Sequence, residues 1–118
     1  MAEVARFPAL TVRDMAFQFV QHELSLDRNA LESPRRCAEL VEGRALFVWI
    51  VKAHGPADLS YPMIGRWLGH RDHSSIQHLF KNKVPQLRRR NADFNCLCAR
   101  FERRLSTLLE TFDGNTSH

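Results

Sequence analysis

One continuous apolar stripe at helical spacing lies near the carboxyl end of the chain. Between residues 94 and 112 the apolar positions recur at offsets of 0, 3, 4, 7, 11, 14, 15 and 18, which is the repeat of one face of an α-helix. They are Phe94, Leu97, Cys98, Phe101, Leu105, Leu108, Leu109 and Phe112. We therefore predict an amphipathic helix over about 91–112 whose apolar face closes a core of other helices.

Helical patterns also account for the rest of the chain, and strand patterns are nearly absent. A capped start at Thr11 opens a predicted helix to about Glu23, and a short turn of helix is expected after Asp27. The segment Ala38–His54 is apolar almost all round in its second half, which is typical of a central buried helix. The same apolar run would also suit a buried strand. The predicted fold class is all-α, a small helical bundle.

Two further short helices are predicted between residues 60 and 84. Ser60 is placed to cap the first of them, and Asp72 is placed to cap the second. A turn that contains Gly69 joins the two, and Pro85 is expected to end the second helix at about Val84. Two short helices joined in this way form a helix-turn-helix, a motif that presents its second helix to the major groove of DNA.

Length and composition leave room for one domain. The 118 residues, 44% of them hydrophobic, are enough for one core, whereas two smaller cores would each lack buried surface. The longest apolar run, Ala45–Val51, is too short to span a bilayer. The start of the chain lacks a signal-type apolar stretch. We therefore expect a single cytoplasmic domain over residues 1–118, and the start at Met1 suggests a whole gene product.

The positive charge is concentrated in one window. The net charge is +4, yet residues 1–61 and residues 91–118 each carry −1. Residues 62–90 carry +6, because seven Lys or Arg stand there against Asp72 alone. A basic block between near-neutral flanks is expected for a phosphate-rich partner, although a solvated surface face would give the same composition. The block includes Lys81 and Lys83 in the second helix of the motif.

The residues at the start of that second helix suit contacts with nucleic acid. The first N–H groups and the positive end of the helix dipole favour an approach to phosphate, and the side chains there reach base edges. Asp72 can accept a hydrogen bond from cytosine N4, and His73 can donate to guanine or thymine acceptors. Two alternatives stay open: Asp72 as a helix cap, and His73 as an ordinary exposed histidine.

A longer stretch of sequence resembles a known family. Residues 60–78 read S-Y-P-M-I-G-R-W-L-G-H-R-D-H-S-S-I-Q-H, and the core R-D-H-[ST]-[ST]-x-x-x-H preceded by P-x-I-G is specific. This stretch resembles the signature of the carboxy-terminal DNA-binding domain of the bacterial replication initiator DnaA. The likeness extends from about Thr11 to Phe112. It implies a helical bundle with a Trp-repressor-like helix-turn-helix that binds double-stranded DNA sequence-specifically.

The resemblance assigns DNA contacts by position. The residues that match base-contacting positions are Arg36, in the adjacent minor groove, and Asp72, His73, Ser74 and Ser75, in the major groove. The residues that match or flank backbone-contacting positions are Arg44, Lys52, Tyr61, Pro62, Arg71 and His78. From the local charge we add Arg35, Lys81 and Lys83 as backbone contacts. A loop arginine such as Arg36 suits a narrow A·T-rich minor groove, where negative potential is strongest, and its alternative is a solvated loop charge.

The chain also departs from the family pattern. Ser74 and Ser75 replace threonines, so a methyl that could pack on a thymine methyl is lost. Glu42 belongs to a stretch that replaces a basic, proline-containing one, and Ala45 stands where an amide is usual. Both call into question the phosphate contacts at the start of the central helix. The family's ATPase module is missing, because no Walker A loop is present and 118 residues leave no room for it.

Metal and nucleophile chemistry find little support in the sequence. His73 and His78 are five residues apart, which points them to different helical faces, and no third ligand has the right spacing. The cysteines Cys37, Cys96 and Cys98 lack a spacing-matched His or Asp, so we interpret them as structural or incidental thiols. No enzyme activity, cofactor or metal is predicted.

Two functions remain for the chain. The first is a sequence-specific DNA-binding protein, monomeric on A·T-containing sites, nucleoid-associated, and regulatory in transcription or replication. The second is a protein-interaction adaptor that keeps the scaffold, binds DNA weakly, and docks another chain through the Phe94–Phe112 helix. Glu42 and Ala45 are the features that favour the adaptor.

Overall fold

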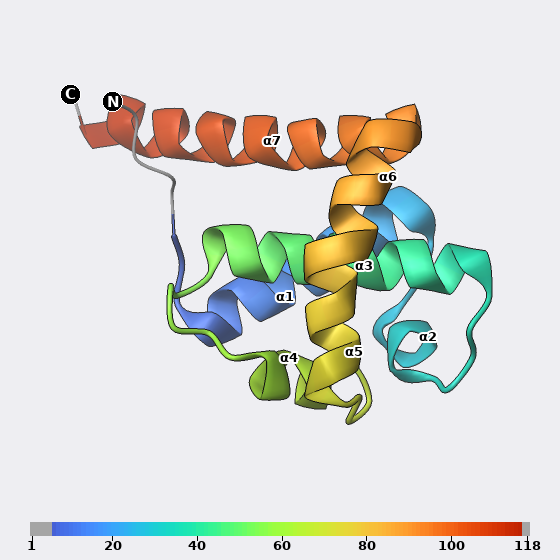
Figure 1. Cartoon of the computed structure of the whole chain (residues 1–118). Helices are drawn as coiled ribbons and strands as arrows, with labels where there is room; N and C mark the ends of the chain where they lie inside the picture. Colours follow the sequence, from blue (N-terminus) through green and yellow to red (C-terminus); the bar gives the residue numbers. More distant parts are fainter. Residues whose placement is uncertain (1–5, 117–118) are drawn as a thin grey trace.

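The described helices follow one another in the order α1 (Ala9–Leu24), α2 (Arg28–Glu32), α3 (Ala38–His54), α4 (Tyr61–Trp67), α5 (His73–His78), the π-helical segment η1 (Leu79–Lys83), α6 (Val84–Arg90) and α7 (Ala92–Thr116). Figure 1 shows this computed structural model, which describes the backbone of residues 6–116 and the side chains of residues 6–108. No strand occurs among these residues. The all-α class predicted from the sequence is confirmed.

The central helix α3 is buried on nearly all sides. Within Ala45–Val51 the most exposed residue is Trp49, at 7%. Phe47 contacts the rings of Phe17 in α1 and Trp67 in α4, with centroid separations of 4.5 and 6.5 Å. The apolar faces of neighbouring helices pack around this segment, as expected for a helix that is apolar all round. The helical interpretation of this run is confirmed and the strand alternative is wrong.

The helix α7 closes one side of the bundle through its apolar stripe. The buried members of the stripe are Phe94, Cys98, Phe101 and Leu105. The stripe leaves the core at Leu108, which is 53% exposed, and the helix continues to Thr116 rather than ending at 112. The side chains of Leu109 and Phe112 lie outside the described residues. Neither α7 nor any other helix in the described ranges has the length and apolar character needed to cross a membrane.

Side-chain caps start both helices of the motif, as predicted. Ser60 Oγ and Asp72 Oδ2 each accept a hydrogen bond from an N–H of the first turn, over 3.3 and 3.0 Å. The predicted cap at Thr11 is wrong, because α1 begins at Ala9, directly after Pro8 and without a side-chain cap. The carbonyl of Pro8 accepts the first helical hydrogen bond instead.

The prediction that Pro85 ends the second motif helix is also wrong. The helix continues through η1 into α6, so that residues 73–90 form one column, yellow to orange in Figure 1. Pro85 lies in the first turn of α6, directly after the π-helical turn. A π turn holds one extra residue, which displaces the carbonyl that the proline ring would otherwise meet and accommodates the missing N–H. The basic residues beyond Pro85 therefore extend this helix.

Close backbone packing holds the two motif helices together. Ile64 and Ile76, one from each helix, are fully buried. The N–H of Arg71 donates to the carbonyl of Gly65 over 2.9 Å, and a Cβ at residue 65 would lie 2.1 Å from the Arg71 carbonyl oxygen. Glycine is therefore required at this position for α4 to approach the turn. This close approach fixes the position of the turn, and therefore of the start of α5, against α4.

Candidate nucleic-acid interface

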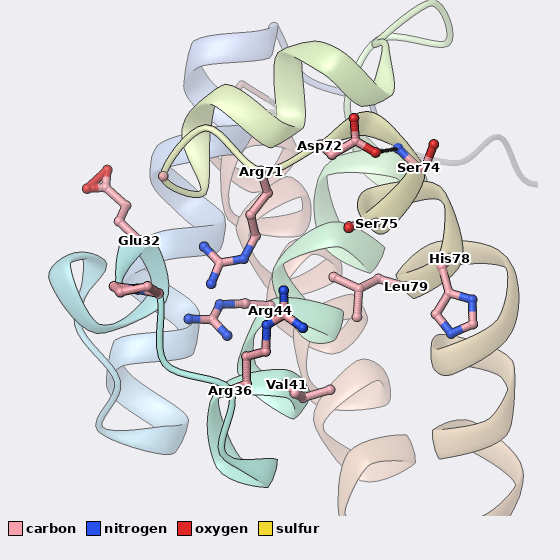
Figure 2. Close-up of a pocket in the computed structure, with 12 residues that line it drawn as sticks. Glu32, Arg36, Val41, Arg44, Arg71, Asp72, Ser74, Ser75, His78 and Leu79 are labelled. Atoms are coloured by element: carbon pink, nitrogen blue, oxygen red, sulfur yellow. Dashed lines mark hydrogen bonds between the residues drawn. The ribbon is translucent and has the colours of Figure 1, made fainter.

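A groove of about 750 Å³ lies between the start of α5 and the loop of residues 33–37 that precedes α3. One wall is this 33–37 loop, which contributes Arg36. The other wall is the first turn of α5 with its cap, which contributes Asp72, Ser74 and Ser75. Figure 2 shows both walls and the guanidinium groups of three arginines between them. Two segments that are far apart in the sequence, both predicted to contact bases, therefore line one groove.

The residues predicted to contact bases share one property, which is exposure. They are Arg36, Asp72, His73, Ser74 and Ser75. The Asp72 carboxylate caps α5 through Oδ2, while its Oδ1 lies 3.6 Å from His73 Nδ1. A carboxylate has about four acceptor sites, so capping leaves Asp72 able to accept a further hydrogen bond. The capping role is confirmed, and base contact stays a prediction.

Arg44 does not have the exposure that a phosphate contact requires. Its exposed fraction is 3%. Its Nε donates to the carbonyl of Leu31 over 2.9 Å, and its two Nη atoms donate to the carbonyls of Arg35 and Ser33, each over 2.7 Å. The expectation that Arg44 contacts phosphate is therefore corrected: its donors hold the backbone of the 33–37 loop. The sequence did carry a signal for burial, because Arg44 lies on the same helical face as Leu40.

Arg71, in the turn between α4 and α5, also donates hydrogen bonds to backbone carbonyls. It is half-buried, and its guanidinium donates to the carbonyls of Leu68 and Ser33. Burial, together with the charge of the nearby Arg36, lowers the pKa of Arg71. Burial and then the charge of Arg71 lower the pKa of Arg44 to about 10. With its pKa at about 10, Arg44 remains a cation at neutral pH.

Few negative charges balance this cluster. The acids that line the groove are Glu32 and Asp72. The Glu32 carboxylate pairs with Arg28 over 3.1 Å. In the described part of the chain no carboxylate forms an ion pair with Arg44 or Arg71. The groove therefore presents net positive charge, which attracts a polyanion.

Of the other predicted backbone contacts, His78 lines the groove, and the rest lie in the 33–37 loop, α3, α4 and η1. The exposed ones are Arg35, Pro62, His78 and Lys81, and the half-buried ones are Lys52, Tyr61 and Lys83. Lys52 Nζ donates to the carbonyl of Leu59 over 3.0 Å and lies 4.9 Å from the ring centroid of Tyr61. His78 Nδ1 lies 2.9 Å from Asn82 Nδ2. Lys52 thus fixes the backbone that leads into α4, whereas its contact with the DNA backbone stays a prediction.

The two departures at the start of α3 have structural explanations. Glu42 Oε1 accepts a hydrogen bond from Asn91 Nδ2 over 3.2 Å, which ties α3 to the junction of α6 and α7. Ala45 is fully buried in the core. Sequence reasoning missed Val41 and Leu79, half-buried residues that add an apolar part to the groove lining. Both follow the helical spacing of their apolar neighbours, and that spacing does not distinguish a residue that lines a groove from one in the core.

Comparison with known families supplies the decisive observation. Residues 14–82 match the family described as "Bacterial dnaA protein helix-turn-helix". The chain belongs to this family. The matched region begins in α1 and ends in η1, so it contains both walls of the groove together with α4 and α5. The resemblance to the DnaA helix-turn-helix noted in the sequence is confirmed.

Three similar proteins carry the name chromosomal replication initiator protein DnaA, and each has about the same sequence identity to this chain. The match to the protein of Synechococcus sp. (strain JA-2-3B'a(2-13)) has 28% identity over 103 residues, which are 87% of this chain and 20% of that protein. The match to the protein of Sphingopyxis alaskensis has 30% identity over 100 residues, 85% of this chain and 21% of that protein. The match to the protein of Bacteroides fragilis has 29% identity over 78 residues, 66% of this chain and 16% of that protein.

This member of the DnaA helix-turn-helix family thus spans about a fifth of the length of the first two of these relatives. No solved structure matches the chain. Membership of the family implies DNA binding by the helix-turn-helix.

Proposed function

We propose that this chain binds double-stranded DNA sequence-specifically and reads a short site with two elements at once. The first turn of α5 enters the major groove, and Arg36 enters the adjacent minor groove. The observation that carries the proposal is the groove, which has the exposed start of α5 on one side and the 33–37 loop on the other. One sugar-phosphate strand separates a major groove from its neighbouring minor groove, so a protein that reads both must straddle that strand. The positive charge between the two walls suits that strand.

Each exposed residue has a role that its chemistry supports. His73 donates to a guanine or thymine acceptor, and Asp72 accepts from cytosine N4 while it caps α5. Ser74 and Ser75 make less selective hydrogen bonds to base edges or phosphate. Arg36 favours A·T pairs, because their minor groove is narrow and strongly negative.

Phosphate contacts add affinity without adding selectivity. The proposed contacts are of two kinds. The exposed ones are Arg35, Pro62, His78 and Lys81, and the half-buried ones are Lys52, Tyr61, Arg71 and Lys83. Each neutralised phosphate releases a counterion, so binding through this set weakens as the salt concentration rises.

The role that follows is regulatory. The relatives are replication initiators, and residues 1–118 contain no Walker A loop that would bind a nucleotide. We therefore propose that the chain occupies its sites in the nucleoid as a monomer, without ATP hydrolysis, and controls transcription or competes with an initiator for shared sites.

Selection from a library of random duplexes with the purified protein tests this proposal. We expect one short, A·T-containing motif to be enriched. Fluorescence anisotropy should then give an affinity for the selected duplex on the order of 10³-fold above that for a scrambled duplex of equal composition. Failure to enrich any motif, together with equal affinities for the two duplexes, would contradict sequence-specific binding.

One observation favours the alternative, a protein-interaction adaptor. A second hollow of about 370 Å³ lies between α1 and α7, lined by Met15, Phe19, Leu105 and the exposed Leu108 among others. An adaptor would bind selected and scrambled duplexes alike. Its affinity for both duplexes would be lost between about 50 and 200 mM salt, as expected for purely electrostatic binding.

A further inference from the structure

Two arginines meet at one carbonyl beside the groove. The Nη2 atoms of Arg44 and Arg71 both donate to the carbonyl oxygen of Ser33, over 2.7 and 2.6 Å. Arg44 also donates to the carbonyl of Arg35, and Arg71 donates to the carbonyl of Leu68. Arg44 belongs to α3, Leu68 directly follows α4, and Ser33 opens the 33–37 loop. The pair therefore joins three parts of the fold that are separate in the sequence.

This junction holds the backbone next to Arg36, the residue that is proposed to enter the minor groove. The carbonyl of Arg35, held by Arg44 over 2.7 Å, precedes Arg36 in the chain. Arg36 itself stays exposed, and its side chain lines the groove. Figure 2 shows Arg36, Arg44 and Arg71 together on this side of α5. The backbone that carries Arg36 is thus fixed, while its guanidinium remains available.

We propose that Arg44 and Arg71 are positioning residues that set the spacing between Arg36 and the first turn of α5, so that DNA meets two reading elements already in register. This inference rests on the proposed function. A loop that had to be ordered at the moment of binding would lose affinity through its conformational entropy, and a preorganised loop avoids that loss. Arg44 acts in this way without touching DNA, and Arg71 does so in addition to its proposed phosphate contact.

The geometry requires arginine in particular. A guanidinium has five donors in a planar fork, so one Arg44 side chain reaches the carbonyls of Leu31, Ser33 and Arg35 together. A lysine keeps the positive charge but places a single ammonium at the end of a flexible stem. The substitution Arg44→Lys therefore separates positioning from charge.

A double-mutant cycle on the selected duplex tests the proposal. Affinity is measured for the wild type, Arg36→Ala, Arg44→Lys and the double variant. We expect Arg36→Ala to weaken binding about tenfold or more in the wild type. In the Arg44→Lys background the same change should weaken binding by less than about threefold, because the 33–37 loop that carries Arg36 is no longer held in place. Lys81→Ala serves as the matched control and should weaken binding by the same factor in both backgrounds.

Base preference gives a readout that general destabilisation would not move. We expect Arg44→Lys to lose discrimination at the base pairs that Arg36→Ala affects, and to keep discrimination at those that His73→Ala affects. Arg71→Lys is the second variant. It removes a bond to Ser33 from a half-buried site, and we expect the same selective loss even where Arg44→Lys folds poorly.

The outcomes distinguish this inference from the proposed function. Equal factors for Arg36→Ala in both backgrounds, with uniform loss of base preference in Arg71→Lys, would overturn the positioning role and leave sequence-specific binding intact. A wild-type protein that does not prefer the selected duplex would overturn the proposed function, and the positioning role with it.

Discussion

The backbone of Gly69 lies against the carbonyl oxygen of Glu32, so closely that a Cβ at residue 69 would lie 2.1 Å from that oxygen. Gly69 also has a φ of +82°, in the left-handed region that glycine adopts without strain. This contact brings the turn of the helix-turn-helix onto the end of α2, directly before the 33–37 loop. The separation of the two groove walls therefore depends on a glycine.

Gly69→Ala is expected to lower the free energy of unfolding by about 2 kcal/mol or more. Roughly 1–2 kcal/mol comes from the left-handed backbone, and the collision with Glu32 adds to it. Urea denaturation measures the change.

Gly43→Ala is the matched control for this substitution. Its Cβ would lie 2.7 Å from Leu26 Cδ1, the end of a flexible side chain that can move. An alanine inside a helix also gains about 1 kcal/mol over glycine. We therefore expect Gly43→Ala to stay within about 1 kcal/mol of the wild type. Similar losses at residues 43 and 69 would contradict the account of the turn.

Asp72 is expected to affect both stability and base preference. Asp72→Ala removes the cap of α5 and should lower the free energy of unfolding by about 1 kcal/mol, whereas Asp72→Asn keeps a capping oxygen and should not. On DNA, Asp72→Asn should relax the preference for cytosine and raise affinity for scrambled duplex, because a negative charge is removed from the groove.

Asp27→Ala provides the comparison for Asp72. Asp27 is also an acidic cap, whose Oδ1 accepts from the N–H of Ala30 over 2.8 Å at the start of α2. Its removal should lower stability by a similar amount, about 1 kcal/mol, without changing base preference. Unchanged base preference in Asp72→Asn would assign Asp72 to capping alone.

The thiols should divide into two classes of reactivity. Cys37 and Cys96 are exposed and Cys98 is buried. Burial raises the pKa of the Cys98 thiol to about 11, so near pH 8 it is both shielded and protonated, and only the thiolate reacts. Titration with a thiol reagent should show two fast groups and a third that appears only on unfolding. Three equal rates would contradict the burial of the stripe on α7.

The same shift predicts how stability changes at high pH. In the unfolded chain the Cys98 thiol ionises near its ordinary pKa of 9.0, whereas in the folded chain it stays protonated up to about 11. Between these values the unfolded state binds fewer protons, so this group lowers the free energy of unfolding as the pH rises from 9.0 to about 11. Urea denaturation across this range measures the effect, and a rise in stability there would contradict it.

The helices were predictable because the features that define them are local. The apolar run of α3 and the stripe of α7 follow helical spacing, and Ser60 and Asp72 accept hydrogen bonds within their own first turns. The continuation past Pro85 was not predictable, because the effect of a proline depends on whether the preceding turn has an extra residue. A π turn has no simple sequence pattern.

The candidate site was predictable only in part. Arg36 and Asp72 were named from the family resemblance, and their common groove emerged only with the fold. The burial of Arg44 depends on the path of a loop nine to eleven residues earlier, whose carbonyls replace water around the guanidinium. The contact of Gly69 with Glu32 joins residues 37 positions apart, which no local pattern encodes.

Base reading by the first turn of α5 can be separated from phosphate binding by comparing two variants. His73→Ala and Lys81→Ala are titrated on selected and scrambled duplexes over a salt series. His73→Ala should lose about 1–3 kcal/mol on the selected duplex and nothing on the scrambled one. Lys81→Ala should weaken both alike and reduce the salt slope by about one. Equal losses from His73→Ala on the two duplexes would contradict base reading by α5.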